Sequence, residues 1–356
     1  MPATLLATHR VEKPWGRHEL RAPFRDSPAD GEPVGEIWFQ APGDAAPDLL
    51  IKYLFTSEKL SVQVHPDDAQ AHARGLPRGK DECWLILGAE PGSTIALGTK
   101  APVERDRLRA AALDGSIEQL LDWKPVKAGD FFYVPSGTVH AIGAGLTLIE
   151  VQQNSETTYR LYDYGRPREL HLGDGIAVAD PRPYVAYPSP GRVADDREIL
   201  VDGPKFVLER LAGGTRTIAL PDGVTAWLIP VTGNGLADGV AFAAGECLTL
   251  TGTVQIAADA GADLLLAYPS PGRVADDREI LVDGPKFVLE RLAGGARTIA
   301  LPDGVTAWLI PVAGNGLVDG VAFAAGECLT LTGTAQIAAD AGADLLLAYP
   351  GEKRLP

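Results

Sequence analysis

Apolar residues along the chain gather into short runs that are separated by glycine, proline and aspartate. Clear examples lie at 49–55, 83–88, 130–135 and 146–153. Their length and their content of β-branched and aromatic residues are typical of strands, and a succession of such strands predicts a sandwich or barrel. We therefore expect a mainly β protein of the jelly-roll or barrel kind.

Two segments depart from this strand pattern. Residues 103–123 place leucines and alanines at helical spacing among charged residues, which predicts a helical insertion between the strands. Residues 181–192 are rich in proline and contain no long apolar run, which indicates a boundary between two regions of the chain.

The sequence of the C-terminal part of the chain occurs twice in tandem. Residues 189–269 and 270–350 align without a gap over 81 positions and differ at only four, which we interpret as a tandem duplication. Solenoid repeats are shorter and more numerous. The first copy has strand-like runs at 205–211, 216–220, 225–231, 246–252 and 262–269. The differing pairs are Thr215/Ala296, Thr232/Ala313, Ala237/Val318 and Val254/Ala335. We expect three domains: an N-terminal domain at 1–185 and the two copies, at 189–269 and 270–350.

Composition narrows the class of protein. The chain has 356 residues, 46% of them hydrophobic, and a net charge of −15, of which each copy carries −5. An acidic surface argues against binding to nucleic acid or to anionic membranes. No apolar run reaches the ~20 residues of a membrane-spanning helix, and the N-terminus lacks the pattern of a secretion signal. Three cysteines without a CxxC pair argue against a disulfide framework. We expect a cytoplasmic protein with no membrane partner.

Candidate chemistry lies in the first half of the chain, since all six histidines precede residue 172. Gln63 and His65 are two apart in a strand-like run and therefore point to the same side. Glu82 begins the next run, and His140 follows a turn at 135–137. Imidazoles, a carboxylate and an amide oxygen suit a divalent ion, zinc above all. Taken alone, however, two histidines so far apart are more often structural residues.

The spacing of further residues resembles the cupin superfamily. Gly129, Pro135, Gly137 and His140 are spaced as in its second motif, although Ala144 stands where that motif usually has asparagine. The run from Gln63 to Gly88 resembles a modified first motif. Longer stretches are similar to the short bacterial form of class I mannose-6-phosphate isomerase. They are EKPWG (12–16), LSVQVHPDD (60–68), KDECWLILG (80–88), GDFFYVPSGTVHAIG (129–143) and IEVQQNSETTYRLYDYGR (149–166).

This resemblance implies a fold, an activity and a set of site residues. The fold would be a cupin jelly-roll barrel with a helical insertion, followed by the smaller β unit in two near-identical copies. The activity would be interconversion of mannose 6-phosphate and fructose 6-phosphate through a cis-enediol or enediolate, with one Zn²⁺ per chain. By motif position the metal ligands would be Gln63, His65, Glu82 and His140. The catalytic residues would be Arg160, Glu150 and Lys80, and the substrate-binding residues Ser61, near the phosphate, and Trp15.

Each assignment has an alternative. Arg160 could form a surface ion pair with Asp163, Lys80 could lie in a solvated turn, Glu150 could be an ordinary strand carboxylate, and Trp15 could belong to the core. The general base is open among Glu150, Lys80 and a water. Other candidate functions are a cupin isomerase or epimerase for a different, even unphosphorylated, sugar, and a non-catalytic cupin that binds sugar or metal. The expected partner is a small sugar phosphate, and the expected state a monomer or weak homo-oligomer.

Overall fold

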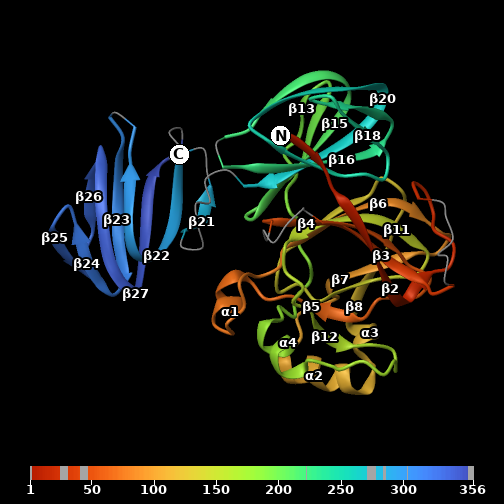
Figure 1. Cartoon of the computed structure of the whole chain (residues 1–356). Helices are drawn as coiled ribbons and strands as arrows, with labels where there is room; N and C mark the ends of the chain where they lie inside the picture. Colours follow the sequence, from red (N-terminus) through yellow and green to blue (C-terminus); the bar gives the residue numbers. More distant parts are fainter. Residues whose placement is uncertain are drawn as a thin grey trace. The chain divides into compact units, whose positions relative to one another are not determined.

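A computed structural model describes residues 2–24, 31–40, 47–221, 223–270, 278–283, 286–302 and 304–351. The chain forms two compact units, residues 1–269 and 270–356. Figure 1 follows the sequence by colour, from red strands at the N-terminus to blue strands in the second unit. Each unit is described by itself.

Two antiparallel sheets form the barrel of the first unit. The six-stranded sheet runs in the order β2 (Ala7–Arg17), β3 (Val34–Gln40), β4 (Leu49–Phe55), β11 (Leu146–Gln153), β6 (Glu82–Ala89), β9 (Phe131–Val134). The five-stranded sheet runs β12 (Tyr159–Tyr162), β5 (Val62–Val64), β10 (His140–Ile142), β7 (Thr94–Thr99), β8 (Leu121–Pro125). One apolar cluster joins the two sheets, since Trp84 and Leu148 of the first pack with Leu97 and Ile142 of the second. The predicted cupin-type jelly roll is confirmed.

Strand β4 explains why the apolar run at 49–55 is continuous. Ile51, Tyr53 and Phe55 point to one side of the sheet and join one core cluster, while Leu54 joins the cluster inside the barrel. A strand that is covered on both faces lacks the alternation of apolar and polar residues, because neither face meets water. Lys52 is the exception, because it lies on the barrel side and is 6% exposed.

The helical insertion predicted over 103–123 is confirmed as two consecutive helices, and the prediction is wrong only where a strand begins at Leu121. Helix α2 (Arg105–Asp114) ends at Gly115, whose φ of 81° is the left-handed conformation that stops helices. A short α3 (Ile117–Leu120) follows, and residues from Leu121 onward enter β8 because they pair with β7. Leu108 and Ala111 of α2 pack with Val62 and Val139 on the outer side of the five-stranded sheet.

Two further helices belong to the barrel region. They are α1 (Asp68–His72) and α4 (Leu172–Val178), and Ile176 of α4 packs in the same outer cluster as α2. No helix among the described ranges is both long enough and apolar enough to cross a membrane.

A nine-stranded sheet completes the first unit. Its main order is β1 (Ala3–Leu5), β19 (Leu248–Thr251), β16 (Thr225–Thr232), β20 (Thr253–Pro269), β15 (Phe206–Ala219), β14 (Arg197–Asp202), β13 (Gly191–Ala194), and the hairpin of β17 (Asn234–Ala237) and β18 (Val240–Ala243) attaches to β20. The N-terminal strand is thus paired to the first of the two copies: Thr4 lies opposite Thr249.

The runs at 205–211 and 216–220, expected as two strands, are parts of one strand, β15. The glycines between them produce a bulge instead of a turn: the register with β20 shifts between Ala212 and Gly214. Gly214 has a φ of 125°, and a Cβ on Gly213 would lie 1.8 Å from the carbonyl oxygen of Asp259. Both positions therefore require glycine.

The nine-stranded sheet packs on the outer side of the six-stranded sheet. Phe206 and Trp227 share one core cluster with Tyr53, Phe55 and Tyr133. The six-stranded sheet is therefore held from outside by this β unit, while its inner side carries Glu82 and Glu150, the carboxylates of the candidate site.

The second unit repeats this strand arrangement. Its sheet runs β21 (Arg278–Asp283), β22 (Phe287–Ala300), β27 (Thr334–Pro350), β23 (Thr306–Ala313), β26 (Leu329–Thr332), with a hairpin of β24 (Asn315–Val318) and β25 (Val321–Ala324) on β27. Its strand registers are those of the corresponding residues in the first copy: Phe206 faces Pro269 as Phe287 faces Pro350. It encloses an apolar core of its own.

Candidate active site

Three side chains of metal-ligand type converge inside the barrel. His65, Glu82 and His140 are each 1% exposed, and one ligand atom from each lies within 4.8 Å of the others. Glu82 begins β6 in the six-stranded sheet, whereas His140 begins β10 and His65 follows β5 in the five-stranded sheet. The group thus bridges the two sheets. Its three residues are far apart in sequence but close in space.

Gln63 lies beside this group because of strand register. It is directly opposite His140 on one side and Arg160 on the other, so the three side chains point to the same face of the five-stranded sheet. Its Nε2 lies 3.2 Å from His140 Nε2, and its Oε1 accepts a 3.2 Å hydrogen bond from Ser61 Oγ. A flip of the amide, which exchanges its oxygen and nitrogen, would direct the oxygen toward His140 and make it a possible ligand.

Both imidazoles are oriented for metal binding. Nδ1 of His65 lies 2.9 Å from the carbonyl oxygen of Thr157, and Nδ1 of His140 lies 2.8 Å from that of Thr138. A carbonyl only accepts, so each Nδ1 carries the proton and each Nε2 keeps its lone pair. These Nε2 atoms lie 3.5 and 3.2 Å from the carboxylate oxygens of Glu82.

The protonation states and unfilled hydrogen bonds fit a bound cation. Burial lowers the pKa of His65 and of His140, which favours the neutral, ligating form. Within the described residues, His65 Nε2 and Glu82 Oε1 are buried without a hydrogen-bond partner. Buried polar atoms are rarely left unpaired. One divalent ion bound by these three residues would satisfy them.

A chain of buried charges extends from Glu82 across the inner side of the six-stranded sheet. Lys80 Nζ lies 3.0 Å from Glu82 Oε2 and 3.9 Å from Glu150 Oε1. Lys52 Nζ lies 3.3 Å from Glu150 Oε1 and 3.9 Å from Glu36 Oε2. Three carboxylates and two ammonium groups thus form one continuous buried network that begins at a candidate metal ligand.

The charges of this chain stabilise one another. Burial alone would lower the pKa of Lys80, but Glu82 and Glu150 outweigh it and raise that pKa. Burial alone would raise the pKa of Glu82, but the charge and hydrogen bond of Lys80 outweigh it and lower that pKa. Lys80 and Glu82 are therefore both charged at neutral pH. Lys80 is buried, not in a solvated turn.

Three residues that sequence reasoning missed support the site. Lys52 and Glu36 extend the charged chain, and the signal for Lys52 was its position as the one charged residue in the apolar run 49–55. Asp81, 3% exposed, accepts hydrogen bonds from Tyr133 Oη at 2.5 Å and from Ser136 N at 2.9 Å. It fixes the turn that leads to His140, and nothing in its local sequence distinguishes it.

The side chain of Arg160 bonds to a residue outside the group of metal-ligand side chains. Arg160 is half-buried, and its Nη1 donates to the carbonyl oxygen of Glu169 at 2.7 Å. Asp163, its alternative partner, forms ion pairs with Arg166 at 2.9 Å and Arg168 at 2.6 Å.

Trp15 is 2% exposed and packs in the apolar cluster inside the barrel, which agrees with its core alternative.

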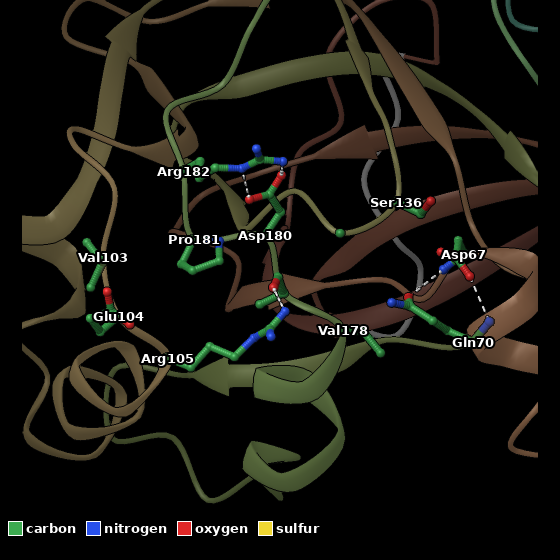
Figure 2. Close-up of a pocket in the computed structure, with 12 residues that line it drawn as sticks. Asp67, Gln70, Val103, Glu104, Arg105, Ser136, Val178, Asp180, Pro181 and Arg182 are labelled. Carbon is green, nitrogen blue, oxygen red and sulfur yellow. Dashed lines mark hydrogen bonds and ion pairs between the residues drawn. The ribbon is translucent and has the colours of Figure 1, made fainter. Parts of the chain in front are cut away.

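A pocket of about 560 Å³ lies near this region but is lined by other residues. Figure 2 shows Arg182 paired with Asp180, and Asp67 bonded to Gln70 at the start of α1. Gly137, also in its lining, donates its N–H to the carbonyl oxygen of His65 at 2.8 Å. None of the site residues expected from the sequence lines this pocket, and these charged lining groups are already engaged.

Comparison with known proteins gives one consistent family name. The chain is 48% identical over 136 residues to a mannose-6-phosphate isomerase of Streptococcus mutans, a match that covers 36% of this chain and 43% of the relative. It thus spans less than half the length of that curated relative. No family model matches the chain.

Solved structures extend the similarity over more of the chain. The crystal structure of the Bacillus subtilis mannose 6-phosphate isomerase is 27% identical and superposes with a TM-score of 0.65, covering 75% of this chain and 99% of that one. A zinc-bound mannose 6-phosphate isomerase, 14% identical with a TM-score of 0.57, covers 76% of this chain and all of its own, and it shares the fold.

Proposed function

We propose that the chain is a metal-dependent aldose–ketose isomerase that interconverts mannose 6-phosphate and fructose 6-phosphate. The observation that carries this proposal is the buried group of His65, Glu82 and His140, with Lys80 3.0 Å from Glu82. The names of the curated relative and of the solved neighbours support the same activity.

The metal is proposed to be one Zn²⁺, held by Gln63, His65, Glu82 and His140. Two neutral imidazoles and a carboxylate are a donor set that catalytic zinc sites use, and with the Gln63 amide as a fourth ligand a substrate oxygen would make the ion five-coordinate. A bound zinc ion would supply Lewis-acid stabilisation of the negative charge that develops on the sugar oxygens. The zinc-bound neighbour of the same fold supports the choice of metal.

The residues of the chain are proposed to move the proton between C1 and C2. Glu150 is the candidate general base, because its Oε1 is within 3.9 Å of Lys80 Nζ and lies on the barrel side of β11. Lys80 and a water are the alternatives. Burial among charges is how enzymes prepare such groups for proton transfer. Arg160, opposite Gln63, would hold the enediolate by its positive charge.

The phosphate is proposed to bind near Ser61. Its side chain is on the same face as Gln63, since the two residues are two apart and its Oγ reaches Gln63 Oε1. A hydroxyl can donate to a phosphate oxygen once it is released from the amide. Trp15, 2% exposed, would contribute by packing behind the site.

The experiment that tests the proposal measures metal and rate on the same sample. Purified chain is assayed for bound metal and for isomerisation of mannose 6-phosphate, before and after chelation and after zinc is restored. We expect about one zinc per chain and a rate that falls on chelation and returns with zinc. Activity on free mannose alone would favour another sugar isomerase or epimerase, and sugar binding without turnover would favour a non-catalytic cupin.

The organisation of the chain is proposed from sequence and register together. Residues 1–185 would be the catalytic domain, and 189–269 and 270–350 two products of a tandem duplication. The matching strand registers of the two copies support this reading. The cytoplasm is proposed as the location because Cys83, Cys247 and Cys328 are all free thiols. Of the two states expected from the sequence, monomer or weak homo-oligomer, the homo-oligomer is the proposed state in solution.

A further inference from the structure

One face of the second unit exposes large apolar side chains. We call it the outer face and define it by Leu281, Val282, Phe287, Trp308 and Val312. These residues are 43%, 38%, 50%, 42% and 52% exposed, respectively. Their counterparts in the first copy share one apolar cluster, and a shared apolar surface of this kind usually marks an interaction site.

The same face is covered in the first copy. Leu200, Val201, Phe206 and Trp227, which correspond to the first four of these residues, are 8%, 1%, 0% and 1% exposed. They pack against the six-stranded sheet, in one cluster with Tyr53, Phe55 and Tyr133. No outer-face residue is among the four positions at which the copies differ. The sequence of the face is therefore one that already forms a protein–protein contact within this chain.

The second unit is well packed behind this face. Leu292, Leu309 and Leu345 are fully buried and Phe323 is 3% exposed, as are their counterparts in the first copy. The residues that touch the barrel in the first copy are among those that are more exposed in the second; Val321 and Leu329 are also more exposed than their counterparts Val240 and Leu248. The outer face is thus the surface of a folded unit and not a sign of incomplete packing.

Each chain has more β units than sheets for them to cover, so the apolar face of one unit remains uncovered. Each chain has one six-stranded sheet to cover and two units with the matching face. If the two units exchange places, on their own chain or on another chain, one outer face per chain remains uncovered. Two chains then present two identical apolar faces, which a twofold axis can bring together.

We infer that the outer face of the second unit binds the outer face of a second copy of this chain, forming a homodimer. Trp308 and Phe287 are the central residues, because aromatic side chains dominate the energy of such contacts. The ion pair of Arg291 and Asp344, 2.7 Å long and half-exposed on the arginine side, belongs to the same sheet and supplies a polar rim.

The test measures the mass of the full chain in solution at micromolar concentrations. We expect a dimer for the native chain, and monomers for Trp308→Lys and for Phe287→Lys, because a lysine in the contact would weaken association at least about 100-fold. Both positions are half-exposed, so folding should survive, and circular dichroism checks this. Leu317→Lys is the matched control: Leu317 is 45% exposed, its counterpart Leu236 is 47% exposed, and the dimer should persist. A monomeric native chain, or a dimer that resists both lysine substitutions, would overturn the inference.

Thiol reactivity separates face-to-face pairing from an exchange of units. Cys328 is exposed, whereas its counterpart Cys247 and Cys83 are buried. Cys247 belongs to the cluster that joins the first copy to the barrel, so its counterpart Cys328 lies on the same side of the second unit as the outer face. Pairing of two outer faces would cover Cys328 and leave Cys247 in place, so the dimer should have no reactive thiol and the Trp308→Lys monomer one. A dimer with one reactive thiol per chain would overturn the inference in favour of exchanged units.

Discussion

Lys80 Nζ and Glu82 Oε2 form a 3.0 Å ion pair in the interior of the barrel, where the two residues are 4% and 1% exposed. The same carboxylate belongs to the candidate metal group. A fixed positive charge therefore stands beside the site whether or not a cation is bound, and it keeps Glu82 ionised and ready to bind one.

Replacement of Lys80 by methionine should destabilise the protein strongly. It would leave Glu82 and Glu150 buried without their shared cation, a loss of the kind that costs roughly 3 kcal/mol or more. Urea unfolding at neutral pH measures the change in the free energy of unfolding. Lys127→Met is the control, since its side chain is 83% exposed and should change that free energy by less than about 0.5 kcal/mol. Equal effects of the two substitutions would contradict the buried-charge argument.

His140→Ala should remove the metal together with the activity. One imidazole of the converging group is lost, so zinc affinity should fall by at least about 10-fold and the isomerisation rate by at least about 100-fold. Elemental analysis of the purified variant and a coupled assay measure both. His72→Ala is matched, because His72 is an exposed histidine of α1 that is outside the group. Full activity in metal-free His140→Ala protein would refute the site.

The pair of Asp68 and Lys205 should make stability depend on pH in acid. Burial alone would raise the pKa of Asp68, but the hydrogen bond and charge of Lys205 help lower it below its usual value. A lowered pKa in the folded state gives stability that is present above the unfolded pKa of about 3.9 and is lost as the pH falls through the folded value.

Asp68→Asn should therefore cost up to about 1 kcal/mol at pH 7, and this difference should shrink below about pH 4. Unfolding curves of both proteins at several pH values measure it. Lys205→Met should give the same pH profile, since it removes the other partner of the pair. A difference that is constant across this range would exclude the ion pair as its source.

Deletion of residues 270–350 should leave a folded protein that retains its metal. The first unit, 1–269, is compact and contains both barrel sheets and a complete β unit. The shortened chain should melt in one transition and bind as much zinc as the full chain. Calorimetry and elemental analysis measure these properties. Aggregation of the shortened chain would mean that the second unit supports the first.

The positions of apolar residues along the chain correctly predicted the strands that are buried on both faces. The runs at 49–55 and 146–153 coincide with β4 and β11, because strands buried on both faces show as continuous apolar segments. The helix predicted over 103–123 extends too far at its C-terminal end, because residues from Leu121 pair with β7, and helical spacing contains no information about such a partner.

The site was predictable to the extent that its residues lie in motifs. Gln63, His65, Glu82 and His140 were chosen from short segments, and register places them together. Glu36 was not predictable, since its role depends on Lys52 across a strand pair and not on its neighbours in sequence. The different exposures of Trp227 and Trp308 were equally invisible, because identical sequences differ only in what covers them.

The pairing of β1 with β19 has a consequence for the order in which the protein folds. Ala3–Leu5 is synthesised long before its partner strand, Leu248–Thr251, which is made only after the whole barrel has been synthesised. The strand Leu329–Thr332 has the same sequence, LTLT, and is made later still. Because a nascent chain folds from its N-terminus, the strand made earlier is available first. The order of synthesis therefore favours pairing of Ala3–Leu5 with Leu248–Thr251, although the two candidate partner strands have identical sequences.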